Sequence, residues 1–247
     1  IGVTKSDNNV EMGLLENCVR EDLNQHAPRR MAVLHPLKVV IENYPEDRVE
    51  ELQAANHPQD ESMGMRSLSF SRELYIDRED FREQAPSKFK RLVSGGEVRL
   101  RNAYVIRCDE VIKDSHGDVI ELRCSYDPDT LAKNPEGRKV KGVIHWVSAR
   151  HGVEAEVRLY DRLFNHPTPG AGKDGTDCLE HLNPESLLTL THCYLEASLA
   201  DAKPGERFQF EREGYFCVDP DHSHNRPIFN RTVTLRDSWA KIEQKHS

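Results

Sequence analysis

From Met31 onward the chain is a series of short apolar or alternating runs separated by turn-forming residues, and this pattern constrains the fold more than any other feature. The runs cover residues 31–43, 72–76, 98–107, 119–126, 139–147, 155–162, 187–190, 207–218 and 228–235. Turn formers such as Gly95-Gly96 and Lys203-Pro204-Gly205 lie between them. Many short strands at this spacing are typical of β-sandwiches and β-barrels, so we expect a mainly β chain.

Two segments have a helical pattern instead. Residues 1–27 carry apolar side chains at helical spacing, with Asn8 and Glu11 placed as a capping box and Pro28 ending the segment. Residues 77–83 form the second expected helix. Residues 99–107 and 118–126 are expected to pair as a β-hairpin, and 247 residues can hold one large domain or two smaller ones.

A basic stretch at residues 88–107 interrupts an acidic chain. It holds six Lys or Arg and one acid, whereas the whole chain has a net charge of −8. On a strand, Arg99 and Arg101 would share one exposed face while Val98 and Leu100 face the core. Two guanidinium forks on one face suit base edges and phosphates, although a solvated strand face is the simpler explanation of any one such pair.

A second informative run is residues 207–216. Phe208 and Phe210 would share one face, and Gln209 and Glu211 the other. An amide and a carboxylate together can hydrogen-bond a pyrimidine edge, and an ordinary amphipathic strand is the alternative.

The composition excludes several classes of protein. A pI near 5.9 argues against general coating of nucleic acid, but a local basic patch can still select one partner. No apolar run has the length of a membrane span, and six scattered cysteines without a CxxC pair favour a reduced, cytoplasmic protein. The chain begins at Ile1, and we interpret it as a fragment or a processed product.

The motifs that could carry chemistry are weak. The run at 170–173 (Gly-Ala-Gly-Lys) lacks the spacing of a phosphate-binding loop. Metal-capable side chains occur at Asp219, Asp221, His222 and His224, and at Cys178 and His181, with loop-like spacing that turn chemistry and surface histidines explain better. Asp127-Pro128-Asp129 is first of all a turn. We therefore expect no catalytic residue and no metal ligand here.

Several long phrases resemble one family. They include Lys90-Arg91-Leu92, residues 98–106, residues 139–148, residues 157–164, residues 208–216 and Phe229-Asn230-Arg231-Thr232-Val233, and the likeness extends from Ile1 over essentially the whole chain. Together they are similar to the C-terminal, anticodon-binding half of bacterial glutaminyl-tRNA synthetases. The resemblance implies two β-barrels after a short helical connector. We place the connector at 1–27, the proximal barrel at 28–152 and 222–247, and the distal barrel at 153–221.

The resemblance also implies roles for matching residues. Arg99 and Arg101 would contact the first anticodon base; Arg29, Gln209 and Glu211 the central uridine; and Lys90 and Arg91 the third base, a guanosine. Arg212 would support this cluster, and Lys5 and Glu11 would lie near the inner corner of the tRNA. Gln59 stands where the family has Asn and keeps an amide with longer reach, while Phe89 stands where the family has Tyr and keeps only stacking.

The activity implied for the whole enzyme is the joining of glutamine to its tRNA with ATP and Mg²⁺. The HIGH-like and KMSKS-like signatures of the catalytic half do not occur here. We therefore expect a fragment that binds glutamine tRNA, holds no cofactor of its own, partners the N-terminal catalytic domain rather than DNA or a membrane, and is monomeric. Alternatives are the same region of a glutamyl-tRNA synthetase, a free-standing ribosomal-type RNA-binding barrel with a preference for 5S rRNA, and a structural protein whose arginine strand is only solvated.

Overall fold

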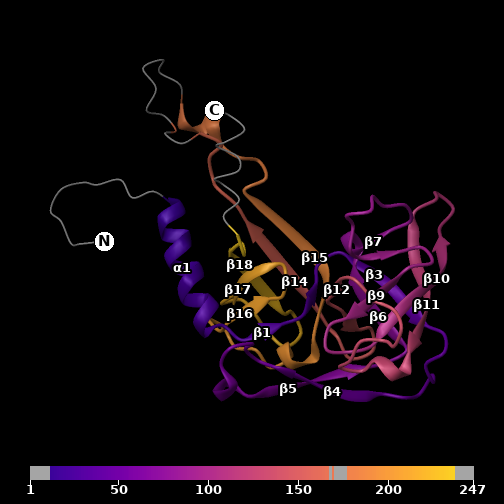
Figure 1. The fold of residues 1–247 in the computed structure, drawn as a ribbon. Coiled ribbons are helices and arrows are strands. Elements are labelled where there is room, and N and C mark those ends of the chain that lie inside the picture. The colour runs from indigo at the N-terminus through magenta and orange to yellow at the C-terminus, as the bar shows by residue number, and fades with distance from the viewer. Residues whose placement is uncertain (1–11, 167–168, 170–176, 237–247) are drawn as a thin grey trace.

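The computed structural model describes residues 12–166, 169 and 177–236, and it begins with one helix. Helix α1 spans Met12–His26, so the expected capping pair Asn8 and Glu11 lies outside the described residues. Leu23 and Ala27 are buried against Tyr215 and Val233, which fixes the C-terminal end of α1 on a sheet (Figure 1). Within the described chain, no helix is both long and apolar enough to cross a membrane.

The first sheet has seven strands. In spatial order they are β12 (Val143–Ile144), β9 (Glu97–Leu100), β10 (Val105–Lys113), β11 (Val119–Asp127), β3 (Pro36–Ile41), β6 (Glu73–Asp77) and β13 (Val147–Ser148). The expected hairpin exists between β10 and β11, which pair antiparallel. Its first strand begins at Val105 rather than residue 99, because a turn separates it from β9: the amide of Ala103 donates to the carbonyl of Leu100 at 3.0 Å, and Asn102 has φ of 57°.

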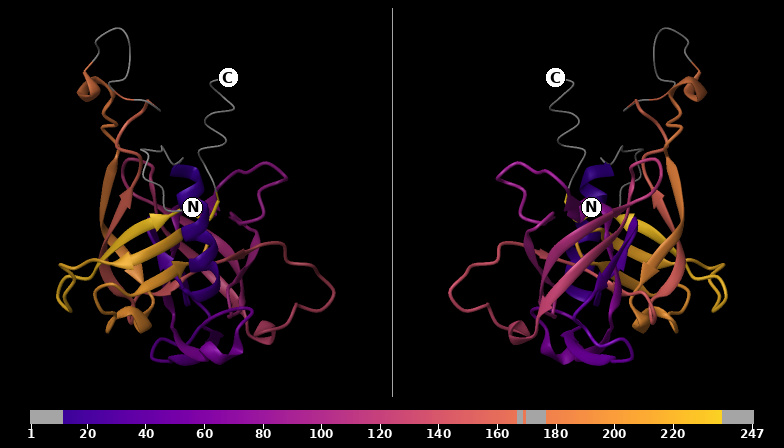
Figure 2. Two further views of the ribbon diagram at one scale, coloured as in Figure 1. Left: turned by 90° about the vertical axis from the view of Figure 1, so that its left-hand side faces the viewer. Right: turned by 90° about the vertical axis from the view of Figure 1, so that its right-hand side faces the viewer.

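The second sheet also has seven strands. In spatial order they are β1 (Arg29–Arg30), β16 (Arg207–Phe210), β17 (Gly214–Val218), β18 (Ile228–Val233), β14 (Val153–Tyr160), β15 (Leu187–Leu195) and β2 (Ala32–Val33). Strands β14 and β15 form a long antiparallel arm that extends beyond the rest of the sheet (Figures 1 and 2).

Both sheets curl because their two edge strands are consecutive along the chain. In the first sheet, only His145 and Trp146 separate β12 from β13, and in the second only Met31 separates β1 from β2. One sheet is thereby a nearly closed barrel and the other a half-barrel. The mainly β fold with two barrel-like sheets and an N-terminal helix is confirmed.

Shorter elements connect and cover the sheets. They are β4 (Glu50–Ala55), β5 (Met65–Phe70), β7 (Phe81–Arg82), β8 (Leu92–Val93) and the 3₁₀ helices η1 (Glu61–Met63), η2 (Arg78–Asp80), η3 (Pro128–Thr130), η4 (Cys178–His181) and η5 (Ala197–Leu199). The β4–β5 hairpin, which the sequence pattern did not indicate, runs along one side of the molecule beneath the two sheets (Figure 1).

The prediction of a helix at residues 77–83 is wrong. Asp77 caps only a single 3₁₀ turn there, and the chain then enters β7.

Each sheet has its own apolar core. Trp146 and Tyr44 pack edge-to-face on Phe70 with ring centroids 5.2 Å away in the first core. In the second core, Phe210 stacks on Phe216 at 4.3 Å. These aromatic pairs supply five of the residues of greatest volume among the fully buried side chains of the two cores.

Sheet pairing divides the chain differently from the expected boundaries. Strand β18, placed with the proximal barrel, runs parallel to β14 and antiparallel to β17, so the described part of 222–247 belongs to the second sheet. Strands β1 and β2 also join the second sheet, as partners of β16 and β15. The reason is hydrogen bonding within the sheet built mainly from 153–218: β18 fills the place between β17 and β14, and β1 and β2 pair with the outer sides of β16 and β15.

Candidate nucleic-acid interface

Arg99, one of the two arginines expected to face an RNA base, binds backbone carbonyls of its own domain. Its Nη1 donates to the carbonyls of Ala103 at 3.1 Å and Thr130 at 2.8 Å, and its Nη2 donates to that of Lys133. Val98 and Leu100 are fully buried on the opposite face, as expected. Both terminal amino groups of Arg99 thus already have backbone acceptors, and its contact with the first anticodon base stays a prediction.

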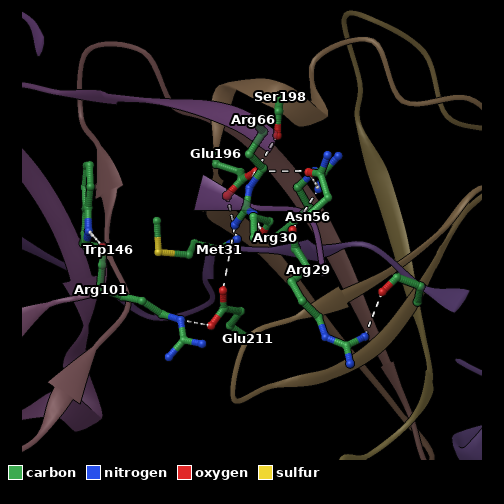
Figure 3. A network of polar contacts seen from close by, with 12 residues as sticks. Arg29, Arg30, Met31, Asn56, Arg66, Arg101, Trp146, Glu196, Ser198 and Glu211 are labelled. Atoms are coloured by element: carbon green, nitrogen blue, oxygen red, sulfur yellow. Dashed lines mark hydrogen bonds and ion pairs between the residues drawn. The ribbon is translucent and has the colours of Figure 1, made fainter. Parts of the chain in front are cut away.

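Arg101 differs, although it stands only two residues away. It follows the last residue of β9, and its amide still bonds the carbonyl of Ile144 at 2.9 Å. Its Nε pairs with Oε2 of Glu211 (Figure 3). Its two terminal amino groups have no partner among the described residues, and the side chain is 45% exposed. Trp146 Nε1 donates to the Arg101 carbonyl at 2.8 Å and fixes the backbone. Arg101 therefore keeps the outer edge of its guanidinium available.

Glu211 joins the two sheets. It leaves the end of β16, is buried, and meets Arg101 on one side and Arg66 Nη2 at 3.8 Å on the other. Burial raises the pKa of its carboxyl above the ordinary value, and the two arginines oppose that effect. Glu211 is thus a buried ion-pair partner of two arginines, and its expected place beside the central base stays a prediction.

Glu211 is also a member of a largely buried group of four residues that we call the Glu196 cluster: Arg30, Arg66, Glu196 and Glu211. Glu196 accepts from Arg66 Nε at 2.7 Å and from the Met31 amide at 2.9 Å, and lies 3.4 Å from Arg30 Nε (Figure 3). Burial lowers the pKa of Arg30, against the attraction of Glu196. Because β1, β5, the N-cap of η5 and the turn after β16 each contribute a member, the cluster ties four distant segments together.

Arg29 and Gln209, expected beside the central base, lie opposite each other in the β1–β16 pair. Arg29 is buried and donates to the carbonyls of Ala27 at 2.8 Å and Asn24 at 2.9 Å, which satisfies free carbonyls at the end of α1. Burial lowers the pKa of its guanidinium. The Oε1 of Gln209 is buried without a hydrogen-bond partner in the described structure, which leaves one acceptor unused.

A second ion-pair group, the Asp80 cluster, consists of Asp80, Arg91 and Arg212. Arg212 holds the fully buried Asp80 with two bonds of 2.6 Å, and Arg91 Nε lies 3.2 Å from the same carboxylate. Burial works against the charge of Arg212, but the bonds to Asp80 leave its pKa raised. The structure thus brings together Arg91 and Arg212, which lie more than a hundred residues apart.

The remaining expected contacts are exposed or outside the described residues. The side chains of Lys90 and Gln59 are exposed and contact no polar side chain among the described residues. The ring of Phe89 lies 5.0 Å from the guanidinium carbon of Arg82, so it already stacks on a cation. Lys5 and Glu11 lie outside the described residues.

Titratable groups also gather where the two sheets meet. The ligand atoms of Asp77, His145 and Glu213 lie within 4.8 Å of one another. Burial lowers the pKa of His145 to about 4 and raises that of Glu213 to about 7. Arg212 Nη1 is 3.4 Å from His145 Nδ1, so a metal ion would meet an existing positive charge, and we assign none.

Several of the metal-capable side chains noted in the sequence make hydrogen bonds or ring contacts within the fold. Asp219 accepts from Arg158 at 3.0 Å and from the amide of Asp221 at 2.8 Å, and His222 Nδ1 accepts from the Ile228 amide at 3.2 Å. These contacts close the loop before β18. Cys178 and His181 lie on η4, where the His181 ring stacks on His166 at 4.7 Å.

Sequence reasoning missed Arg66, Glu196 and Asp80, which organise the expected residues. A signal for Arg66 exists: it alternates with Leu68 and Phe70, and all three are buried on β5. A charge on the apolar face of a strand indicates a buried ion pair. Asp80 and Glu196 stand in 3₁₀ turns or at their caps and carry no comparable periodic signal.

Chemically, the arrangement supplies hydrogen-bond donors held at fixed positions. Arg101, Arg91 and Arg212 have side chains 45%, 37% and 31% exposed, and each is oriented by a buried carboxylate. Preoriented guanidinium groups suit planar acceptors such as base edges.

Comparison with known proteins agrees with this interpretation. Two profiles described as "tRNA synthetases class I (E and Q), anti-codon binding domain" match residues 27–127 and 143–219. A glutamine–tRNA ligase of Pseudomonas putida is 62% identical over 241 residues, which is 97% of this chain and 42% of that protein. Those of Pseudomonas syringae and Tolumonas auensis are each 60% identical over 97% of this chain, and over 42% and 43% of their own lengths.

The chain therefore spans about two-fifths of the length of these relatives. The two matched segments together include all strands from β1 to β17. On these matches, the chain belongs to the family of anticodon-binding domains of the class I tRNA synthetases for glutamate and glutamine, in the region that glutamine–tRNA ligases share.

Proposed function

We propose that this chain reads the anticodon of glutamine tRNA. The observation that carries the proposal is the meeting of Arg101, from the turn after β9, with Glu211, from the turn after β16. Two segments a hundred residues apart thus face one place at the boundary of the two sheets. The identity with glutamine–tRNA ligases over nearly the whole chain supports glutamine as the cognate amino acid.

Recognition would work through oriented donors. Glu211 holds Arg101 by Nε and leaves the two terminal amino groups for the acceptors of an unstacked base. Asp80 likewise holds Arg91 by Nε, while Nη1 of Arg91 donates to the carbonyl of Glu79 at 3.1 Å, so Nη2 is the amino group left for a base. A wrong base would leave one of these groups desolvated and unpaired, which costs about 1–3 kcal/mol per contact.

Ligation is proposed for the longer protein only. Its relatives are glutamine–tRNA ligases, and we propose that the longer protein joins glutamine to tRNA with ATP and Mg²⁺. No residue of this chain is assigned to either cofactor, because Arg212 already faces the carboxylate and imidazole cluster of Asp77, His145 and Glu213. A catalytic domain preceding this chain, a cytoplasmic location and a monomeric state are part of the same proposal.

A binding comparison tests the reader directly. Filter binding at fixed salt would compare glutamine tRNA with versions substituted at each anticodon position. We expect a loss of about 1–3 kcal/mol at each read position, and Arg101→Ala should remove the penalty at one of them while Arg101→Lys restores it only in part. Equal affinity for all of these tRNAs would overturn the proposal.

Glutamate tRNA is the second candidate, because the matching family description covers both the E and the Q enzymes. The same assay with glutamate tRNA separates the two. Tighter binding of glutamate tRNA than of glutamine tRNA would favour the second candidate.

A further inference from the structure

Two neighbouring loops, one between β7 and β8 and one between β11 and β12, carry an excess of lysine, of which the expected anticodon contacts include only Lys90. Residues 84–91 hold three basic residues and no acid, and residues 131–142 hold four basic residues and one acid. The five lysines, which we call the lysine shelf, are exposed and have no side-chain partner within the described structure: Lys88, Lys90, Lys133, Lys139 and Lys141. In an acidic chain, such a concentration of unpaired cations needs a counter-charge.

The two loops form one surface because the chain brings them into contact. Gly142 has φ of +93°, and a Cβ added there would lie 1.8 Å from the carbonyl oxygen of Lys90. Only glycine allows this approach. Figure 2 shows both loops extending from the same flank of the molecule.

The arginines of this region anchor the longer loop and leave its lysines free. Arg138 pairs with Glu97 at 3.0 Å and with Asp127 at 2.6 Å, both from the first sheet. Arg99 holds the carbonyls of Thr130 and Lys133. These contacts hold the longer loop in place. The guanidinium groups of Arg99 and Arg138 are paired, whereas the ammonium groups of the lysine shelf have no partner within the described structure.

Lysine in this arrangement suits phosphate rather than bases. Its ammonium is a compact charge on a flexible stem, which neutralises a polyanion without reading sequence. The shelf is continuous with the reader, since Lys90 precedes Arg91 of the Asp80 cluster. We propose that the lysine shelf binds the sugar–phosphate backbone of the tRNA beside the anticodon; this rests on the proposed anticodon-reading function.

The test is the double variant Lys139→Gln/Lys141→Gln, measured by filter binding over a series of salt concentrations. We expect weaker binding by the same factor for glutamine tRNA and for anticodon-substituted tRNA. The plot of log K against log salt has a negative slope, and this slope should become shallower by about 1–2, because two phosphate contacts are lost. The Lys139→Arg/Lys141→Arg variant should retain affinity and slope, since charge is the property that matters.

The matched control is Lys203→Gln/Arg226→Gln, which removes the same charge from exposed positions near the second sheet and should leave the slope unchanged. An unaltered slope in the shelf variant would overturn the proposal, as would a changed preference among anticodons. Displacement of tRNA by poly-glutamate as readily as by an unrelated RNA of equal charge would also overturn it. If the unmodified chain bound no tRNA, the proposed function itself would fail. If the unmodified chain distinguished anticodons but the Lys139→Gln/Lys141→Gln variant bound tRNA with the same salt dependence, only the lysine-shelf proposal would be refuted.

Discussion

Two charged groups join the sheets of this molecule, and they differ in how much solvent reaches their arginines. In the Glu196 cluster the side chains of Arg66 and Arg30 are 4% and 12% exposed, while in the Asp80 cluster those of Arg91 and Arg212 are 37% and 31% exposed. Each cluster is organised by a buried carboxylate. A sealed guanidinium can only hold the fold, whereas a half-exposed one can hold the fold and still meet a ligand.

One turn supplies members to both groups. Between β16 and β17, Glu211 enters the Glu196 cluster, Arg212 enters the Asp80 cluster, and Glu213 faces His145. Arg212 has φ of +72°, a left-handed conformation unusual for a residue with a side chain. This backbone shape lets three successive side chains reach three different groups, so one turn connects the Glu196 cluster, the Asp80 cluster and His145.

The largest expected effect is on the sealed group. Arg66→Met should lower the free energy of unfolding by about 3–5 kcal/mol, because Glu196 and Glu211 stay buried with fewer partners. Urea unfolding followed by circular dichroism measures the change. Adding Glu196→Gln should cost less than the two single changes together. A loss for Arg66→Met below 1 kcal/mol would remove the distinction between the two clusters.

The next effect concerns Glu213, whose pKa of about 7 lies above the ordinary value of 4.5 because of burial. The folded state keeps this proton to higher pH than the unfolded chain, so the stabilisation is present below pH 4.5 and is lost as pH rises to about 7. Relative to the unmodified chain, Glu213→Gln should gain stability across this window, by at most roughly 1.4 kcal/mol per pH unit.

The stability contribution of His145 should depend on pH in the opposite direction to that of Glu213, which gives an internal check. Its pKa of about 4 lies below 6.5, so the folded state favours the neutral ring, and that contribution is lost as pH falls from 6.5 to 4. His145→Gln should therefore lose stability relative to the unmodified chain as pH rises. Parallel pH profiles for the two variants, from urea unfolding at each pH, would contradict the opposed titration of this pair.

A smaller loss of stability is expected in the half-exposed group. Asp80→Asn should cost about 2 kcal/mol, because the charge-assisted bonds to Arg212 weaken while water can still reach both arginines. Filter binding should show a reduced penalty for a substituted third anticodon base, since Arg91 loses its orientation. Asp109→Asn, which removes an exposed partner of Arg107, is the matched control and should change neither measurement.

Local pattern was enough to predict which residues face inward, and too little to predict what they touch. The alternation of Val98 and Leu100, and of Phe208 and Phe210, placed these residues correctly in the cores. The partner of Arg99 could not be foreseen, because the carbonyls of Thr130 and Lys133 come from a loop some thirty residues away. Periodicity reports the direction of a side chain and is silent on long-range contacts.

The same limit explains the element errors. Residues 77–83 have the polar composition of a helix, but Asp77 caps one 3₁₀ turn and the next residues pair with β8. Strand β18 was placed with the proximal barrel from the chain path that the resemblance implies, whereas its hydrogen-bonding partners are β17 and β14 of the second sheet. Edge satisfaction is a property of the assembled sheet, so no single segment shows it.

The smallest effect on stability, and the sharpest test of the comparison, belongs to Arg91. Arg91→Gln should change the free energy of unfolding by no more than about 0.5 kcal/mol, because Arg212 continues to hold Asp80 and the Arg91 side chain is 37% exposed. Its effect on tRNA binding should be larger, at about 1–3 kcal/mol, since a base contact would be lost. Arg107→Gln, at another exposed ion pair, should affect neither quantity. If Arg91→Gln lowered stability and binding by equal amounts, its role would be that of the sealed arginines, and the half-exposed cluster would have no separate place in recognition.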